Sequence, residues 1–322
     1  MNRVIVLILI LLAAIGPLLG EYQIYLLSLT LLWGILALGM GILLGYIGEI
    51  NFGQAGFVAI AAYTSTLLRQ KLGWSFWEAA PVALFAVVSC AAIVGMITMR
   101  LRGPFFVLVM LGFGEIVRLV LANWQAVTNG PVGLRQIAPP EPLFGIAFDS
   151  KVSFYYLLLV TLAVSTLILA RMLRLRMGRM FVAIREDELL AEFVGVHLMR
   201  SKVTALCISA FVGGVGGLLM GPFLTVVAPN QFGLFASMDM VVMVIVGGVG
   251  TLAGPLLGAV FLIYVPELLS FAREMRPAVM GVLLILVTLF LPGGLLGWGQ
   301  LMRKKLCALY GRRFTTSKQD KL

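Results

Sequence analysis

The chain has 322 residues, of which 61% are hydrophobic and only 12% are charged. A soluble domain carries about 25% charged residues, so this composition excludes a soluble globular protein and predicts a membrane protein. The net charge of +10 would suit a nucleic-acid partner, but the basic residues lie in blocks beside hydrophobic segments, as in cytoplasmic loops. We therefore expect a lipid bilayer as a partner and no nucleic acid.

The hydrophobic segments predict an all-α polytopic membrane protein with about ten transmembrane helices (range 8–10), since a helix needs roughly 20 apolar residues to cross a bilayer. The first segment could be a signal peptide, but it lacks a clear cleavage site, so we favour a retained helix. The shortest, 237–249, could be tilted or broken. The predicted crossings are 3–20, 24–48, 51–68, 78–99, 103–125, 153–172, 204–226, 237–249, 254–270 and 277–298.

The basic residues orient these crossings. With the N-terminus in the cytoplasm, inside segments collect 17 of the 24 Lys and Arg residues and outside loops collect six. This bias predicts that both termini are cytoplasmic. We expect a membrane domain over 1–302 and a basic cytoplasmic tail over 303–322.

Two loops stand out by length. Residues 126–152 form a Pro/Gly-rich outside loop, and residues 173–203 form the one long cytoplasmic loop. Within the second, 181–195 predicts a short amphipathic helix that stops at Gly195. It could lie on lipid headgroups, but a membrane-binding helix usually has a basic polar face. The acidic residues here favour a helix that docks in a groove of a cytoplasmic protein.

The sequence lacks the residues that catalysis or cofactor binding would need. No G-x-x-x-x-G-K-[ST] motif occurs, and His197 is the only histidine. Neither a phosphate-binding loop, nor a catalytic triad, nor a metal site is predicted. The three cysteines are far apart and predict neither a disulfide framework nor a zinc site. We expect no enzyme activity and no cofactor, so energy from ATP would have to come from another polypeptide.

Polar residues inside the predicted crossings are candidates for a translocation path, because they are costly in a bilayer. Glu115 and Arg118 lie three residues apart on one helix face. They form either an ion pair that fixes helix packing or a lining of the path. Asn51 and Gln54, at the start of the third crossing, either hydrogen-bond across helices or line the path.

Glycines recur at four-residue spacing, which permits close helix packing. The set Gly247, Gly248, Gly250 and Gly254 lies at the end of the shortest crossing, just before Pro255. We expect these glycines to pack helices together or to form a hinge or helix break.

Four ordered motifs carry a resemblance to a known family. They are Gly48 to Phe57, Phe113 to Arg118 with the following Asn123-Trp124 and Thr128-Asn129-Gly130, Ala183 to Gly195, and Gly247 to Pro255. Together they resemble the LivM/LivH-type permeases of branched-chain amino acid ABC importers, and the second and third resemble the LivM branch. Many members have Gly-Gly where Asn129-Gly130 stands here.

The resemblance implies a transmembrane permease subunit in the bacterial inner membrane, translocating leucine, isoleucine and valine. Implied partners are a second permease of the LivH type, two cytoplasmic ATP-binding subunits and a periplasmic substrate-binding protein. Urea or another amino acid is the alternative substrate; a secondary transporter, a channel or a membrane scaffold is a distant alternative. The implied ATPase-coupling residues, among which Glu188 and Gly195 are favoured, are Arg185, Glu186, Asp187, Glu188, Ala191, Glu192 and Gly195.

Overall fold

The computed structural model describes residues 20–101, 103–143, 145, 147–268, 281, 285, 294, 295 and 297. Residues 3–19 of the first predicted crossing, the last two residues of the crossing 254–270, nearly all of the crossing 277–298 and the tail 303–322 lie outside the described residues.

The described residues are mainly helical. In chain order the elements are α2 (Glu21–Ile42), the π-helix η2 (Leu43–Ile47), α3 (Gln54–Leu72), α4 (Phe76–Thr98), α5 (Pro104–Asn123), α6 (Gln125–Thr128), the 3-10 helix η3 (Gly130–Val132), β1 (Leu134–Arg135), α7 (Lys151–Arg174), α8 (Arg176–Glu186), α9 (Glu188–Phe193), α10 (Leu198–Leu224), β2 (Val226–Val227), the 3-10 helix η4 (Pro229–Phe232), α11 (Leu234–Gly247) and α12 (Gly254–Leu268).

The lengths and composition of these helices fit a protein that crosses a membrane several times. Five helical segments in the described part of the chain are long and apolar enough to span a bilayer: α2 with η2, α4, α5, α7 and α10. The helices α11 and α12 are apolar but shorter. The helix α3 corresponds to the predicted crossing 51–68, although it begins three residues later. The total of ten crossings stays a prediction.

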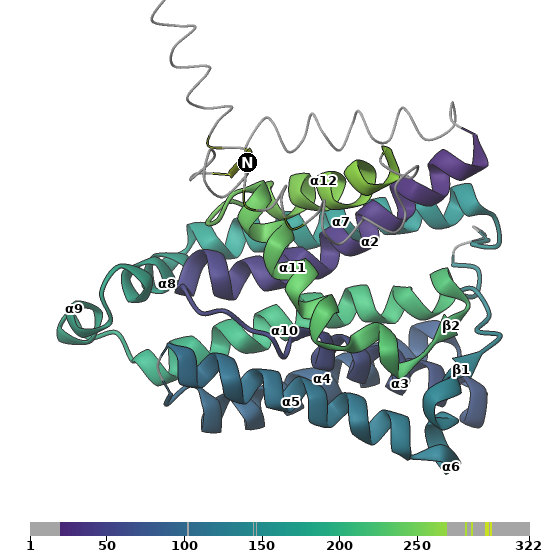
Figure 1. Cartoon of the computed structure of the whole chain (residues 1–322), viewed down its shortest axis with the longest axis horizontal. Coiled ribbons are helices and arrows are strands. Elements are labelled where there is room, and N and C mark those ends of the chain that lie inside the picture. Colours follow the sequence, from purple (N-terminus) through teal and green to yellow (C-terminus); the bar gives the residue numbers. More distant parts are fainter. Residues whose placement is uncertain are drawn as a thin grey trace, which may run out of the picture.

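The helices form two groups that meet at α2 and α10 (Figure 1). The helices α3 and α4 pack against α10, with α5 outside α3, whereas α7, α11 and α12 pack against α2. The spanning segment of α2 is 89% buried, but that of α4 is 22% and that of α5 is 17% buried. The core therefore lies along α2 and α10, and α4 and α5 turn most of their surface outward.

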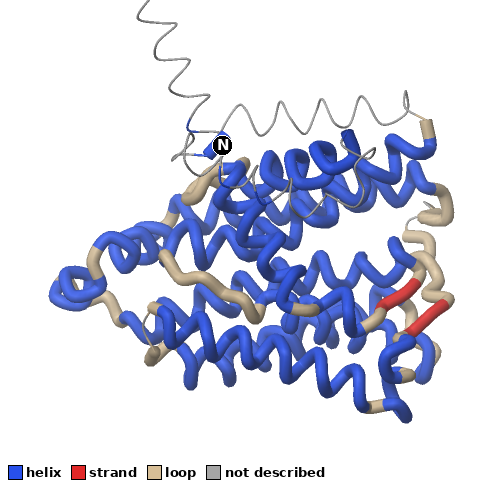
Figure 2. Tube along the Cα trace, in the orientation of Figure 1, coloured by secondary structure: helices blue, strands red, loops and turns tan. Residues whose placement is uncertain are grey.

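The two ends of the bundle differ (Figure 2). The short helices α8 and α9 project from one end, which we call the loop-helix end. At the opposite end, β1 and β2 pair antiparallel with Leu134 opposite Val227. We call this the hairpin end after that pairing, although α7 to α10 lie between the two strands in the sequence. This two-residue pairing, which the all-α prediction did not contain, ties the loop after α5 to the end of α10.

Local sequence signals set the helix boundaries at the hairpin end. The helix α3 ends at Gly73, whose φ of +67° is the left-handed conformation that glycine adopts at low cost. The helix α4 begins with a capping box between Ser75 and Glu78, which satisfies two backbone amides left free by the first turn. The chain therefore turns from α3 into α4 within three residues.

Glycines allow the closest helix contacts. A Cβ on Gly217 of α10 would lie 2.5 Å from the Val58 carbonyl oxygen of α3, and one on Gly258 of α12 would lie 1.8 Å from the Met243 oxygen of α11. No side chain fits at such distances, so these helices meet through their backbones. The packing role expected of the small-residue ridges is present at both contacts.

Candidate functional site

A fully buried polar cluster lies where α2, α3, α10 and α11 meet. The amide of Asn51 donates to Gln54 Oε1 at 3.0 Å, and Gln54 Nε2 donates to the Ser209 carbonyl oxygen at 3.0 Å. The Ser209 hydroxyl donates to the Gly39 carbonyl oxygen at 2.8 Å, and the Ser237 hydroxyl accepts from the Ala55 amide at 3.0 Å. Gln54 therefore hydrogen-bonds across helices, the first of the two roles expected for it, whereas Asn51 bonds to Gln54 within the same segment.

This cluster depends on a break in the chain between α2 and α3. The helix α2 widens into η2 and ends at Gly48, whose φ is +89°. Asn51 lies in the non-helical connection, and its Oδ1 accepts the Gly53 amide at 2.9 Å. Non-helical backbone at membrane depth must be covered by protein, and the buried cluster provides that cover.

A buried ionic cluster connects this break to the loop-helix end. Lys202, near the start of α10, donates to Glu49 at 3.0 Å and to Glu188 at 2.5 Å. The Lys202 side chain is 3% exposed and that of Glu49 is 11% exposed. Because a buried charge is costly unless paired, this arrangement holds α9, α10 and the α2–α3 connection together.

A second contact at the same end comes from Arg185, the penultimate residue of α8. Its Nη1 donates to the Gly45 carbonyl oxygen of η2 at 2.7 Å. The same nitrogen would lie 3.0 Å from a Cβ on Gly250, in the turn between α11 and α12. Arg185 therefore touches two separate parts of the membrane bundle.

The loop over 173–203, which is predicted to be cytoplasmic, contains two short helices rather than the single helix predicted over 181–195. The helix α8 ends at Glu186, and Asp187 leaves the helical conformation with φ −159° and ψ 114°. Its carboxylate accepts the Leu190 amide at 3.0 Å and so caps α9. The single-helix prediction failed because Asp187 acts as a cap. The expected stop at Gly195 is present, with φ of +87°.

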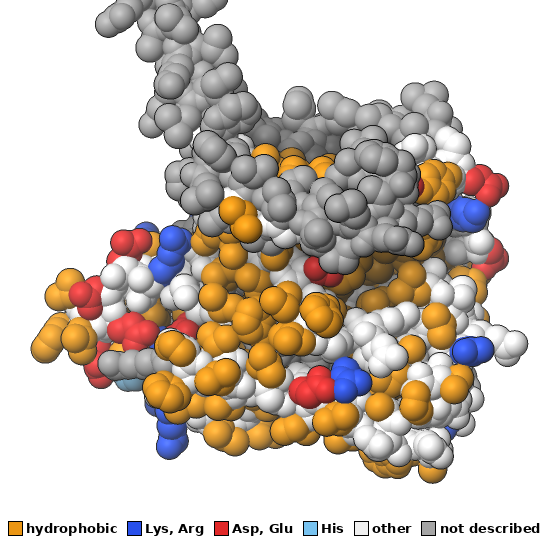
Figure 3. Space-filling model, in the orientation of Figure 1, with side chains coloured by type: hydrophobic (Ala, Val, Ile, Leu, Met, Phe, Trp, Pro, Cys, Tyr) orange, Lys and Arg blue, Asp and Glu red, His pale blue; other side chains and the backbone are white. Residues whose placement is uncertain are grey.

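The tip formed by α9 and the residue after it presents apolar side chains outward. We call it the α9 tip; it comprises Leu189, Leu190, Phe193 and Val194. Phe193 is 86% exposed and Val194 is 77% exposed. Figure 3 shows hydrophobic side chains at this projecting end, beside acidic ones. Glu188 turns instead toward Lys202 of the same chain.

The predicted ion pair on α5 is present. Arg118 Nε donates to both carboxylate oxygens of Glu115 at 2.9 Å. The side chains are 24% and 39% exposed, so the pair lies on the outer surface of α5. It is separate from the buried cluster of Asn51 and Gln54, so the four candidate path residues form two sites.

The glycines between α11 and α12 combine tight packing with a break. A Cβ on Gly247 would lie 1.7 Å from the Gly254 carbonyl oxygen. Gly248 and Gly250 have φ of +127° and +79°, conformations that other residues rarely adopt. The turn packs against η2, since a Cβ on Gly45 would lie 2.9 Å from the Gly250 amide nitrogen.

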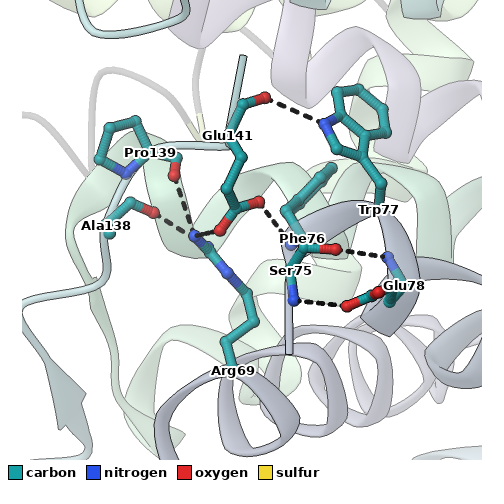
Figure 4. A network of polar contacts seen from close by, with 8 residues as sticks. All are labelled: Arg69, Ser75, Phe76, Trp77, Glu78, Ala138, Pro139 and Glu141. Carbon is teal, nitrogen blue, oxygen red and sulfur yellow. Dashed lines mark hydrogen bonds and ion pairs between the residues drawn. The ribbon is translucent and has the colours of Figure 1, made fainter. Parts of the chain in front are cut away.

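At the hairpin end, the middle of the 126–152 loop is clamped to the α3–α4 turn (Figure 4). The Arg69 guanidinium donates to the carbonyl oxygens of Ala138 and Pro139 at 2.9 Å and to the Glu141 carboxylate at 3.1 Å. The other Glu141 oxygen accepts the Phe76 amide. We call these contacts the Arg69–Glu141 clamp.

The clamp also controls the ionisation of Glu141. Burial by itself would raise the pKa of the Glu141 carboxyl group, but the Phe76 amide and the Arg69 guanidinium stabilise the charged form. The net result is a Glu141 pKa below its ordinary value. The loop is therefore fixed by a carboxylate that is charged at neutral pH.

Several residues of these clusters were not predicted from the sequence. Lys202 and Glu49 belong to no motif that marks them as partners. Neither Ser209 nor Ser237 stands out, because serines in apolar helices usually bond to their own backbone. The one available signal was that Glu49 and Lys202 are charged residues close to a helix end, Glu49 just after η2 and Lys202 in the first turns of α10.

Comparison with known proteins gives a consistent result. The family model for the permease component of branched-chain amino acid transport systems matches residues 22–288. The LivM permease protein of the high-affinity branched-chain amino acid transport system of Escherichia coli K12 is 34% identical over 84% of this chain and 68% of its own length.

More distant relatives extend the comparison. The LivH permease protein of E. coli K12 is 27% identical over 82% of this chain and 91% of its own length. A probable LivM permease protein of Methanocaldococcus jannaschii is 23% identical over 89% of this chain and 99% of its own. No solved structure matches. The chain is a multi-pass membrane protein and belongs to the family of branched-chain amino acid transport permeases.

Proposed function

We propose that the chain is one transmembrane subunit of an ATP-driven importer in the bacterial inner membrane, that it carries leucine, isoleucine or valine, and that separate ATPase subunits drive it. The observation that carries this proposal is the loop-helix end. An exposed apolar tip projects there, and buried ionic contacts tie it to the membrane bundle.

The α9 tip is the proposed contact with one of two cytoplasmic ATPase subunits. A groove on the ATPase would bury Leu189, Leu190, Phe193 and Val194, and the exposed acids Glu186 and Glu192 would face basic groups around it. Glu188 keeps its proposed coupling role and would pass force inward through Lys202. Ala191 and Asp187 maintain the shape of α9, one by packing and one as its cap.

From the loop, movement would reach the bundle at two points. Lys202 links α9 to Glu49, next to the α2–α3 break. Arg185 links α8 to the Gly45 carbonyl oxygen and to the turn at Gly250. These points lie where the helices are interrupted, and interrupted helices change direction more easily than continuous ones. A shift of α8 and α9 would therefore act on α2, α3, α11 and α12 together.

The translocation path is proposed to involve two sites. Asn51 and Gln54 sit at the junction of four helices, where a shift of α10 or α11 would exchange their hydrogen bonds for bonds to substrate. Glu115 and Arg118 offer one anionic and one cationic group, the charges that complement the two ends of a zwitterionic amino acid. Gly247, Gly248, Gly250 and Gly254 form the proposed hinge.

A periplasmic binding protein would deliver substrate at the hairpin end. The Arg69–Glu141 clamp gives part of the 126–152 loop a fixed shape, as a docking surface requires. A cavity of about 330 Å³ opens beside this loop and is lined by Tyr25, Phe148, Phe154 and Phe223, among others.

Reconstitution tests the proposed function. The chain is placed in proteoliposomes with a second permease of the family, two ATPase subunits and a binding protein from the same genome, and uptake of labelled leucine is measured. We expect uptake that requires ATP and every subunit. Concentrative uptake by the chain alone would contradict the proposal, and uptake of urea in place of leucine would contradict the substrate.

The variant Gly195→Pro tests the coupling loop within that assay. Proline fixes φ near −65°, whereas Gly195 has φ of +87°. We expect the variant to reach the membrane and to lose uptake. Normal uptake by Gly195→Pro would count against the coupling role of this loop.

A further inference from the structure

Charges within the described spanning helices and the shorter apolar helices α11 and α12 are confined to two neighbouring elements. Apart from the first and last five residues of each helix, charged side chains occur only at Glu115 and Arg118 of α5 and at Asp239 of α11. The helices α4 and α7, which also expose much of their surface, carry none outside those terminal residues.

These three charged residues lie on the surface. Glu115 and Arg118 are partly exposed, and Asp239 is exposed. Charged groups in the interior of a membrane-spanning helix are costly when they face lipid, and they normally face a protein neighbour or a water-filled cavity. The surface of α5 and α11 is therefore poorly suited to lipid.

The three residues belong to one continuous face, which we call the α5–α11 face. The stem of Arg118 passes over Gly233, just before α11, so that a Cβ on Gly233 would lie 3.6 Å from Arg118 Cδ. Around the charges the face is apolar, with Ile116 and Leu119 exposed on α5 and Phe235 and Met238 exposed on α11. Figure 3 shows an acidic and a basic side chain side by side within this hydrophobic surface.

We propose that the α5–α11 face is the surface on which the second permease packs, whereas α4 and α7 face lipid. An apolar surface with a few central charges is what a protein partner with complementary polar groups would cover. The relatives include both a LivM and a LivH permease protein of one transport system in E. coli K12. The occupant is therefore a different chain of this family. This inference rests on the proposed function.

Spin labelling in the assembled importer tests the assignment. Each variant carries one cysteine in a background in which the three native cysteines are replaced by alanine. Ile116→Cys and Met238→Cys place the label on the proposed interface, and Ile93→Cys on α4 and Val160→Cys on α7 are matched controls of similar exposure. Collision of each label with dissolved oxygen, which concentrates in lipid tails, is measured in vesicles.

We expect the labels on α4 and α7 to show strong oxygen broadening in the assembled importer and the labels on α5 and α11 to lose it. The α5 and α11 labels should regain it when the chain is reconstituted alone. Equal broadening at all four sites in an importer that still takes up leucine would overturn the inference and leave the proposed function intact.

Two other results would also decide against it. If the label at Ile116→Cys in the chain alone is protected from oxygen and its spectrum is broadened by a second nearby spin label, a second copy of this chain covers the face. Failure of the chain to associate with any second permease, together with absent uptake, would overturn both the inference and the proposed function.

Discussion

At the scale of single residues, Lys202 has the most demanding environment. One buried ammonium group pairs with both Glu49 and Glu188, which come from different parts of the chain. Such a group stabilises a structure only while all of its partners remain, because each unpaired buried charge carries a large desolvation cost.

Replacing Lys202 with methionine should therefore be strongly destabilising. The change leaves two carboxylates together at a mostly buried site, and removing one partner of a buried pair costs about 3 to 5 kcal/mol. We expect a lower unfolding temperature in detergent and loss of uptake. The matched control is the triple variant Lys202→Met with Glu49→Gln and Glu188→Gln, which should recover stability but not uptake. Recovery of both would show that the cluster is not needed for coupling.

Gly247 is limited by space rather than by charge. A Cβ there would lie 1.7 Å from the Gly254 carbonyl oxygen, so Gly247→Ala must force α11 and α12 apart. Overpacking of this kind costs about 1 to 3 kcal/mol. Thermal unfolding should show the loss, whereas Gly112→Ala in α5, where nothing lies within 4 Å, should be neutral or slightly stabilising. Equal effects of the two changes would contradict the packing described here.

At the scale of elements, α8 and α9 act as a unit fixed at its base and exposed at its tip. Arg185 and Glu188 provide the base, and the α9 tip provides the free apolar surface. A chain segment with this distribution can transmit a force applied at its far end without rearranging itself. The two functions can therefore be separated by mutation.

The double variant Leu190→Ser and Phe193→Ser tests the tip. Both side chains are exposed, so folding should be unaffected, but the apolar area available to an ATPase groove falls. We expect the ATPase subunits to co-purify less and uptake to drop, with an unchanged unfolding temperature. The control is Leu72→Ser. Leu72 has a comparable exposure and is the last residue of α3, at the hairpin end of the bundle. Undiminished ATPase binding would exclude the tip as the docking element.

The 126–152 loop should respond to pH through Glu141. Its pKa is lowered in the folded protein, so the carboxylate stabilises the clamp at neutral pH and this contribution is lost as pH falls through the lowered pKa. Limited proteolysis of the loop should accelerate on acidification, and Glu141→Gln should be cleaved rapidly already at neutral pH. Asp149→Asn, at an exposed position of the same loop, serves as control. A cleavage rate independent of pH would contradict the clamp.

At the scale of the whole molecule, the sequence predicted which segments are helical because long apolar runs have few alternatives in a bilayer. The crossings that became α2, α4, α5, α7 and α10 were found in this way. The break at Asp187 was missed, because an acidic residue within an amphipathic pattern looks the same whether it continues a helix or caps the next one.

The polar sites also divide into those that the sequence predicted and those that it did not. Glu115 and Arg118 were predicted as a pair because their spacing places them on one helix face. Lys202 and Glu49 are separated by 153 positions, and no local pattern indicates which distant helices meet. Such partners become visible only when the packing of α2 against α10 is known.

The length of α11 has a consequence for the surrounding bilayer. Its 14 residues rise about 21 Å at 1.5 Å each, against a hydrocarbon thickness of about 30 Å. Lipid in contact with α11 would have to thin locally, and such hydrophobic mismatch favours association of proteins over solvation by lipid. Longer acyl chains should therefore strengthen the association of the two permeases, and we expect the amount of assembled importer to rise with membrane thickness.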